Sequence, residues 1–359
     1  GRRPLRSSAG GSFGPSVGER LAVSSDCPVF RLPEFARGKS GVSSRIRVRG
    51  KAPSVRSGAA DRFERHRGRL ATLRSYCNNP RGLPPCTSIA VSRQETMQYF
   101  CGIDIGAATA KLVIVDENGQ TVGRSLCRSG VDYVKAAEKI LAEALAAAKL
   151  DRADIGCSVW TGYGRENGPW REGRMTEIAC HGRGAWHHLR RKMTLIDIGA
   201  QDSKIIHLDD QGRRTSFKMN RKCAAGTGSF LEEIALRLAL PVSDLNDLAE
   251  CSKKEVTLGS FCTVFTATEI LAKIRVGERV EDIVKGAFRS VVRRIMEMDL
   301  ADGALVMTGG VVAHNPYLAT LVGESFGQPV LVPPDPQHIG AFGAALFAMN
   351  KIKSGEKVC

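Results

Sequence analysis

Long apolar runs and an even cysteine framework are both missing from this chain of 359 residues. No apolar run approaches the 18 or more residues that a membrane-spanning helix needs, and the chain does not open on the compact apolar core of a signal peptide. The eleven cysteines are an odd number and are scattered without short, regular spacing. This usage favours a reducing compartment over a secreted disulfide scaffold, so we expect a cytoplasmic protein without a membrane partner.

Methionine is absent from residues 1–96, and lysine is scarce there, with 17 Arg against 2 Lys. With 6 acidic residues this leader carries +13 of the total net charge of +15, whereas the remaining residues carry +2. The charge therefore predicts no nucleic-acid partner for the main body. The leader is rich in Arg, Gly, Ser and Pro, which fits a disordered basic arm, a targeting peptide or translated upstream DNA. We favour the third interpretation and set residues 1–96 apart from the fold.

An internal repeat follows the leader. GIDIGAATAKLVIVDENGQ (102–120) matches LIDIGAQDSKIIHLDDQGR (195–213) at a constant offset of 93 residues, with eight identities in nineteen positions. Such self-similarity indicates a duplicated unit. Each copy is typical of a β-hairpin that bends at IDIGA.

Each bend combines a carboxylate, glycine and, five residues later, a lysine on the returning strand. Two facing copies would present two carboxylates and two backbone turns to one cleft, which suits a Mg²⁺-bound phosphate chain. The alternatives are two ordinary glycine hairpins with solvated surface lysines. The candidate residues are Asp104 and Asp197 as organisers of Mg²⁺ and water, Gly106 and Gly199 as turns, and Lys111 and Lys204 as phosphate contacts.

The rest of the sequence alternates strands and helices, which predicts an α/β fold. The segment ALVMTGG (304–310) reads as a buried strand whose end, Gly309 and Gly310, lets a nucleotide base or ribose approach the backbone. We expect a first subdomain over 97–193, a second over 194–350 whose closing helix packs back on the first, and a tail over 351–359. Further helices are expected at 131–149, 174–191, 229–240, 243–251, 266–275, 280–298, 315–325 and 337–350, and strands at 155–160 and 329–332.

The order of these motifs resembles the acetate kinase, sugar kinase, Hsp70 and actin superfamily. More closely, TGYGR (161–165), EIACHGRGA (177–185), NRKCAAGTGSFLE (220–232), GSFCTVF (259–265) and MTGGVVAHN (307–315) resemble the ATP-dependent activators of 2-hydroxyacyl-CoA dehydratases, a resemblance that spans 99–350. It implies duplicated ribonuclease H-like, actin-like ATPase domains with an interdomain cleft for ATP or ADP and Mg²⁺. The first loop departs from the family pattern, because Ala107 and Ala108 follow DIG where Ser or Thr is usual, so Thr109 is the nearest hydroxyl. The second loop has Ala200 where a second glycine is usual, and Gln201 is the candidate residue for positioning water.

Two cysteines, Cys223 and Cys262, stand in similar settings ahead of expected helices. Each is followed by a capping-box pattern, Ser229 with Glu232 and Thr266 with Glu269, and helix N-termini favour thiolates and anionic clusters. We expect Gly226 and Gly228 to leave space beside Cys223, and Gly226, Thr227 and Gly228 to contact nucleotide. The alternative for any cysteine is simple burial, which we assign to Cys101 and Cys157.

Two thiolates cannot complete a four-thiolate site, but a twofold homodimer supplies four. Zinc held in the same way is the competing possibility. The resemblance implies one [4Fe–4S] cluster per homodimer, an acceptor dehydratase or reductase with its own iron–sulfur cluster, and an electron donor such as ferredoxin or flavodoxin. The implied function is an ATP-hydrolysing donor of low-potential electrons to a 2-hydroxyacyl-CoA dehydratase. The alternatives are an ATPase subunit of benzoyl-CoA reductase, a small-molecule kinase and a regulatory nucleotide binder.

Glu177 and His181 are four residues apart and share one face of the expected helix. They fit either a functional pair near the nucleotide or a satisfied pair on the helix surface, and the sequence does not choose between these readings.

Overall fold

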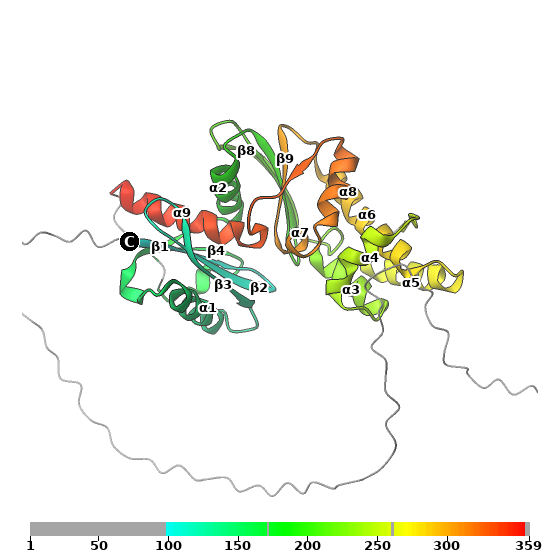
Figure 1. Cartoon of the computed structure of the whole chain (residues 1–359), viewed down its shortest axis with the longest axis horizontal. Helices are drawn as coiled ribbons and strands as arrows, with labels where there is room; N and C mark the ends of the chain where they lie inside the picture. The colour runs from blue at the N-terminus through cyan, green and yellow to red at the C-terminus, as the bar shows by residue number, and fades with distance from the viewer. Residues whose placement is uncertain (1–97, 171, 260–261, 356–359) are drawn as a thin grey trace, which may run out of the picture. The chain divides into compact units, whose positions relative to one another are not determined.

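The computed structural model describes residues 98–355 except 171, 260 and 261, so the predictions for residues 1–96 and for the end of the tail lie outside the described residues. The described strands form two five-stranded sheets of the same topology (Figure 1). The first has the order β3-β2-β1-β4-β5 and the second the order β8-β7-β6-β9-β10. The strands are β1 (Tyr99–Ile105), β2 (Thr109–Val115), β3 (Thr121–Arg128), β4 (Ile155–Gly162), β5 (Gly173–Arg174), β6 (Met193–Ile198), β7 (Ser203–Leu208), β8 (Arg214–Asn220), β9 (Ala304–Thr308) and β10 (Val330–Leu331).

The two predicted hairpins fold identically. Asp104 pairs with Lys111 across β1 and β2, and Asp197 pairs with Lys204 across β6 and β7. In both sheets the first three strands are antiparallel, and a parallel strand lies on the other side of the first, β4 beside β1 and β9 beside β6. The sequence repeat is therefore a repeat of structure, and the α/β fold class is confirmed.

The described helices follow the expected ranges within a few residues, the usual uncertainty of helix ends. The expected helix over 266–275 begins three residues earlier, and the one over 315–325 is preceded by a separate short helix. The helices are α1 (Tyr133–Ala148), α2 (Glu177–Leu189), α3 (Gly228–Arg237), α4 (Leu245–Cys251), α5 (Thr263–Arg275), α6 (Val280–Met298), α7 (Gly310–His314), α8 (Tyr317–Phe326) and α9 (Ile339–Lys353), with a 3₁₀ turn η5 (Pro336–His338) before α9.

Both predicted capping boxes are wrong. Helix α3 begins at Gly228 with Thr227 as N-cap, and α5 begins at Thr263 with Cys262 as N-cap, so Ser229 and Thr266 lie inside their helices. Thr266 is fully buried, and the Glu269 carboxylate accepts from the backbone N–H of Gly259 at 2.7 Å instead of turning back to a cap. The sequence pattern of a capping box is present, but side chains that could cap the helices make tertiary contacts instead.

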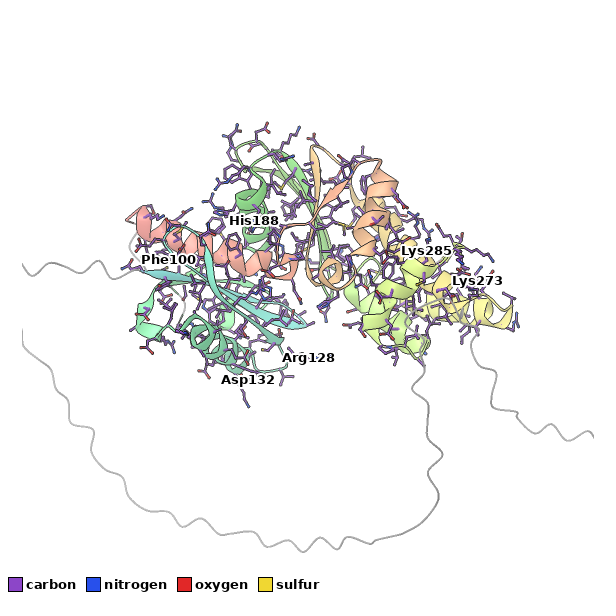
Figure 2. All side chains as sticks on the ribbon, in the orientation of Figure 1. Phe100, Arg128, Asp132, His188, Lys273 and Lys285 are labelled. Carbon is purple, nitrogen blue, oxygen red and sulfur yellow. The ribbon has the colours of Figure 1, made fainter. Side chains whose placement is uncertain are left out.

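Helices α2 and α9 lie between the two sheets. The closing helix α9 packs on β1, β2 and β4 of the first sheet, and it also crosses α2 (Figure 1). His188 lies on α2 (Figure 2). Its imidazole stacks on the ring of Phe342 on α9 with 4.9 Å between the ring centroids. The closing helix therefore returns to the first sheet, although the strands that precede it belong to the second.

Each sheet is covered on both faces. In the second sheet Leu195 and Ile206 face a cluster with α2, whereas Ile196 and Ile205 face the large apolar cluster formed with the helices between α3 and α8. Because side chains alternate along a strand, sheets with two covered faces need continuous apolar strands, and β6 is buried throughout. Cys101 and Cys157 lie buried in β1 and β4, as predicted. None of the helices within the described ranges is long and apolar enough to cross a membrane.

Candidate functional site

The two hairpin bends have the same backbone geometry. The N–H of Gly106 donates to the carbonyl of Thr109 at 3.0 Å, and the N–H of Gly199 donates to the carbonyl of Asp202 at 3.0 Å. Ala107 and Ala108 are exposed at the first bend, and Thr109 begins β2. The bend therefore forms without the usual hydroxyl side chain, because its closing hydrogen bond joins two backbone groups.

Asp104, the second-last residue of β1, is almost completely buried. Its Oδ2 accepts from the Lys111 ammonium at 3.2 Å, whereas its Oδ1 is buried without a hydrogen-bond partner among the described residues. Two glycines pack closely against it, because a Cβ on Gly162 would lie 2.4 Å from Oδ1 and a Cβ on Gly340 would lie 3.0 Å from Oδ2. Burying a carboxylate oxygen without a hydrogen-bond donor costs free energy. This oxygen is therefore a candidate acceptor for a further donor or a cation.

Lys204 lies at the centre of the site with no exposed side-chain surface. Its ammonium contacts Asp202 at 2.8 Å, Asp197 at 3.1 Å and Glu177 at 3.1 Å. Burial by itself would lower the pKa of Lys204, but these three carboxylates outweigh burial and raise it. The alternative of a solvated surface lysine is therefore wrong for this residue.

His181 connects helix α2 to the end of β6. Its Nδ1 lies 3.2 Å from Thr308 Oγ1 and 3.3 Å from Asp197 Oδ1, and the Thr308 hydroxyl donates to the same carboxylate oxygen at 3.1 Å. Glu177, one turn earlier on the helix, lies 4.0 Å from Nε2. Glu177 and His181 are thus part of the site, and the reading of a surface pair is wrong.

The charges around Asp197 shift its pKa. Burial would raise the pKa of this carboxyl group, but His181 and Lys204, together with hydrogen bonds from Lys204 and Thr308, lower it to about 2. Burial is the largest influence on Glu177 and raises its pKa in spite of the nearby Lys204. Asp197 is therefore held ionised, whereas Glu177 is the weaker acid of the two.

Glu177, His181 and Asp197 offer ligand atoms that lie within 4.8 Å of one another, which is close enough for one metal ion. The ammonium of Lys204, however, lies 3.1 Å from both Glu177 and Asp197. A fixed positive charge already occupies the space between the carboxylates, so we assign no metal ion to this trio. Asp104 lies outside this trio, and its buried Oδ1 has no hydrogen-bond partner among the described residues.

The predicted adenosine turn lies against the second hairpin. Gly309 has a φ of 100°, and a Cβ there would lie 2.4 Å from the Ile198 carbonyl oxygen. The close contact with β6 therefore requires glycine at position 309, and this requirement does not depend on a ligand. Gly310 begins α7 beside Gln337, and Gln201 is exposed at the second bend.

The Cys223 loop is hydrogen-bonded directly to the second bend. The N–H of Gly228 donates to the Gly199 carbonyl at 2.9 Å, and the N–H and hydroxyl of Ser229 donate to the Ala200 carbonyl at 2.8 and 2.7 Å. Gly226 and Gly228 do not leave open space as predicted. A Cβ on Gly226 would lie 2.9 Å from the Arg294 side chain, and one on Gly228 would lie 3.2 Å from Ala200. These glycines allow close packing of the protein against itself, and Thr227 is fully buried with its hydroxyl donating to Ala224.

The two predicted ligand cysteines differ in their setting. Cys262 is the N-cap of the thirteen-residue helix α5 and is partly exposed. Cys223 is exposed in a turn five residues before α3, and its Sγ accepts from the N–H of Ala225 at 3.4 Å. Both thiols precede helices, as predicted, but only Cys262 stands directly at a helix N-terminus. Since α3 and α5 pack together, both cysteines belong to one helical region.

Sequence reasoning missed Thr308 and Asp202 and left Glu177 and His181 undecided. Thr308 directly precedes Gly309 and Gly310, so its place at the end of a buried strand was the available signal. Asp202 is the second residue after Ala200 in the loop, and its carboxylate lies 2.8 Å from the Lys204 ammonium. Glu177 and His181 had a helical spacing but no local sign of which surface they would face.

Comparison with known proteins places these features in a family. Residues 101–348 match the BadF/BadG/BcrA/BcrD ATPase family, and the chain belongs to that family. A 2-hydroxyisocaproyl-CoA dehydratase activator of Clostridioides difficile is 36% identical over 262 residues, which are 72% of this chain and 98% of that protein. The (R)-2-hydroxyglutaryl-CoA dehydratase activating ATPase of Acidaminococcus fermentans is 38% identical over 260 residues, 70% and 98% of the two chains.

A solved structure shares the fold. The activator of the 2-hydroxyisocaproyl-CoA dehydratase from Clostridium difficile with bound ADPNP superposes with a TM-score of 0.67 at 35% identity, covering 72% of this chain and 97% of that one. The predicted duplicated, actin-like ATPase fold is thereby confirmed.

Proposed function

We propose that this protein is an ATP-hydrolysing, iron–sulfur electron donor that activates a 2-hydroxyacyl-CoA dehydratase. The observation that carries the proposal is the direct hydrogen bonding of the Gly199–Ala200 bend to the start of α3, next to the exposed thiol of Cys223. A phosphate-type bend and a ligand-type cysteine are thereby parts of one backbone unit. Its similarity to the dehydratase activators supports the same assignment.

The residues around Asp104 and Asp197 fit MgATP. Four carboxylates here face the ammonium groups of two lysines, Lys111 and Lys204; the carboxylates are those of Asp104, Asp197, Glu177 and Asp202. The buried Oδ1 of Asp104 lacks a donor among the described residues. In this proposal Asp104 and Asp197 orient Mg²⁺ and the attacking water, with Gln201 beside them. Lys111 and Lys204 contact phosphate. The bends at Gly106 and Gly199, Thr109 and the Gly309–Gly310 turn line the nucleotide. Gly228 packs against the second bend, whereas Gly226 packs against Arg294 and the Thr227 hydroxyl donates to Ala224 within its own loop.

The two cysteines fit a [4Fe–4S] cluster shared across a homodimer. Thiolates are the ligands that iron–sulfur clusters use, and a twofold axis turns the pair Cys223 and Cys262 into four. Next to Cys262, Val264 and Phe265 expose 71% and 67% of their surface, which is unusual for large apolar side chains and suits burial against a second copy. When bound, the cluster would supply one-electron transfer at low potential, received from a carrier such as ferredoxin or flavodoxin.

The chain's own part in coupling is mechanical. Movement of the 199–202 bend on nucleotide binding would pull on Gly228 and Ser229 through three hydrogen bonds, and α3 and the Cys223 loop would follow. The two predicted subdomains, 97–193 and 194–350, are the parts that we expect to rotate.

The test is an anaerobic preparation of the full chain and of the variants Cys223→Ser and Cys262→Ser, with Cys127→Ser as control because Cys127 is a partly buried strand cysteine. We expect four iron atoms per dimer, absorbance near 400 nm that dithionite bleaches, and MgATP hydrolysis in the wild type; each ligand variant loses the iron and the control keeps it. A colourless, iron-free protein that hydrolyses ATP would refute the electron-donor role and leave the kinase or the regulatory binder. Activation of a benzoyl-CoA reductase but of no dehydratase would replace the acceptor.

A further inference from the structure

Helix α2 sends two side chains into the site although it belongs to neither duplicated hairpin. Glu177 in its first turn reaches Lys204, and His181 one turn later reaches Asp197 and Thr308. Both partners of Glu177 and His181 are buried, since Lys204 has no exposed side-chain surface and Asp197 has 2%. Contacts of this kind in a buried cluster are strong and depend on geometry.

The helix itself is fixed to both sheets. Cys180 belongs to the apolar cluster that contains Phe100 and Cys157 of the first sheet, whereas Ile178 and Ala185 belong to the cluster with Leu195 of the second. Residues of this one helix therefore pack in apolar clusters of both sheets. The position of any side chain that α2 extends toward the second hairpin therefore depends on where the first sheet lies.

Glu177 differs from the other carboxylates that hold Lys204. Asp197 and Asp202 come from the same hairpin as the lysine, so they fix its ammonium only within that hairpin. Glu177 is the contact from another element, at 3.1 Å. It determines where the Lys204 ammonium lies relative to the first sheet and to Asp104.

His181 has a corresponding role for Asp197. The Thr308 hydroxyl gives its single proton to Asp197, so the Nδ1 of His181 is assigned as the N–H that donates toward Thr308 and Asp197. The other ring nitrogen then faces Gly340, where a Cβ would lie 2.7 Å from Nε2 and 3.0 Å from Asp104 Oδ2. The imidazole thus stands between the carboxylates of the two hairpins.

We propose that Glu177 and His181 are positioning residues for ATP hydrolysis, Glu177 acting through Lys204 and His181 acting through Asp197. The proposal rests on the ATPase part of the proposed function and not on the cluster. Neither residue needs to touch the nucleotide. Their role is to hold an ammonium and a carboxylate in the relative position that the transition state requires, which affects kcat more than ATP binding.

The first experiment separates charge from shape at Glu177. Steady-state ATPase of the full chain is measured for Glu177→Gln, which keeps the shape, and Glu177→Asp, which keeps the charge, with Glu143→Gln on the exposed face of α1 as control. We expect Glu177→Gln to lower kcat about tenfold or more with KM for ATP changed less than about threefold, and Glu177→Asp to retain more activity than Glu177→Gln. A merely structural role predicts the reverse order, because Gln fits the space and Asp does not. That reverse order, or unchanged kcat, would overturn the proposal.

The second experiment uses the hydrogen-bond donor of His181. Asn can place an amide N–H close to the position of Nδ1, so His181→Asn is expected to keep more of kcat than His181→Ala, while His187→Gln on the same helix stays at the wild-type value. Equal loss in His181→Asn and His181→Ala, together with equal loss of thermal stability, would assign the residue to packing alone.

A double-variant cycle identifies the route. If Glu177 acts through Lys204, Glu177→Gln lowers kcat less than about twofold once Lys204→Met is present. A full, independent loss in that background would contradict the route through Lys204. A wild-type chain without any ATPase would refute the proposed function itself, whereas wild-type ATPase that Glu177→Gln leaves intact would refute only this inference.

Discussion

The crossing of α2 and α9 is the contact on which the position of Glu177 and His181 depends, and one added methyl group tests it. At the crossing, a Cβ on Gly184 would lie 2.6 Å from the Ile339 carbonyl oxygen and 3.3 Å from the backbone nitrogen of Gly343. Backbone atoms cannot turn away as a side chain does, so Gly184→Ala must push the two helices apart. Gly182, two residues earlier on the same helix, is the matched control, because a Cβ there meets only the Leu208 methyl carbons, at 3.2 and 3.7 Å.

The expected magnitude follows from two opposing contributions. Either substitution gains about 1 kcal/mol of helix propensity when Ala replaces Gly. Overpacking at Gly184 costs about 1–3 kcal/mol or more, so Gly182→Ala should be about 2 kcal/mol more stable than Gly184→Ala. For a folded region of this size, that difference corresponds to about 4–8 °C in the thermal midpoint.

Thermal and urea unfolding followed by circular dichroism, together with ATPase rates, test this prediction. We expect Gly184→Ala to have the lower midpoint and a reduced kcat, since α2 carries Glu177 and His181 into the site, and Gly182→Ala to remain at or above wild type in both. A Gly184→Ala protein as stable and as active as Gly182→Ala would refute the close crossing of the helices.

Three further predictions concern pH and packing. In the nucleotide-free protein the pKa of Asp197 is lowered to about 2, so its stabilisation is present above pH 4 and is lost as the pH falls toward 2. It amounts to about 2 kcal/mol, about half of it gone at pH 3, and urea unfolding of Asp197→Asn should lack that part of the acid dependence. Burial, with Arg124 and Lys111 nearby, lowers the pKa of His338 to about 4, so the unfolded chain binds its proton first as the pH falls below 6.5. Between pH 7 and 5 we therefore expect a loss of about 1–2 kcal/mol that His338→Gln abolishes, and an unchanged slope in the variant would contradict the burial of the ring. Phe288→Ala should cost about 3–5 kcal/mol in the same assay, because the ring is fully buried in the large apolar cluster, and a loss below 1 kcal/mol would show that the ring is not packed there.

Local pattern was sufficient for the elements of this fold. The offset of 93 residues predicted two hairpins in one register, and the pairs Asp104 with Lys111 and Asp197 with Lys204 show that register. A duplicated sequence repeats its turns and its apolar alternation, and these are properties of neighbouring residues. The same local reasoning failed at the caps of α3 and α5, because a side chain that fits a cap can also be used by a tertiary contact.

What the sequence by itself determined is therefore the repeated strand–bend–strand unit, its carboxylates and lysines, and the α/β class. The tertiary structure alone decided that Glu177 and His181 face Lys204 and Asp197, and that Thr308 completes the site. Asp197 and Thr308 are 111 residues apart, and their hydrogen bond exists only because β6 and β9 pair in parallel. The periodicity of a helix shows which residues share a face, but what that face meets depends on how distant segments pack, and no local pattern records it.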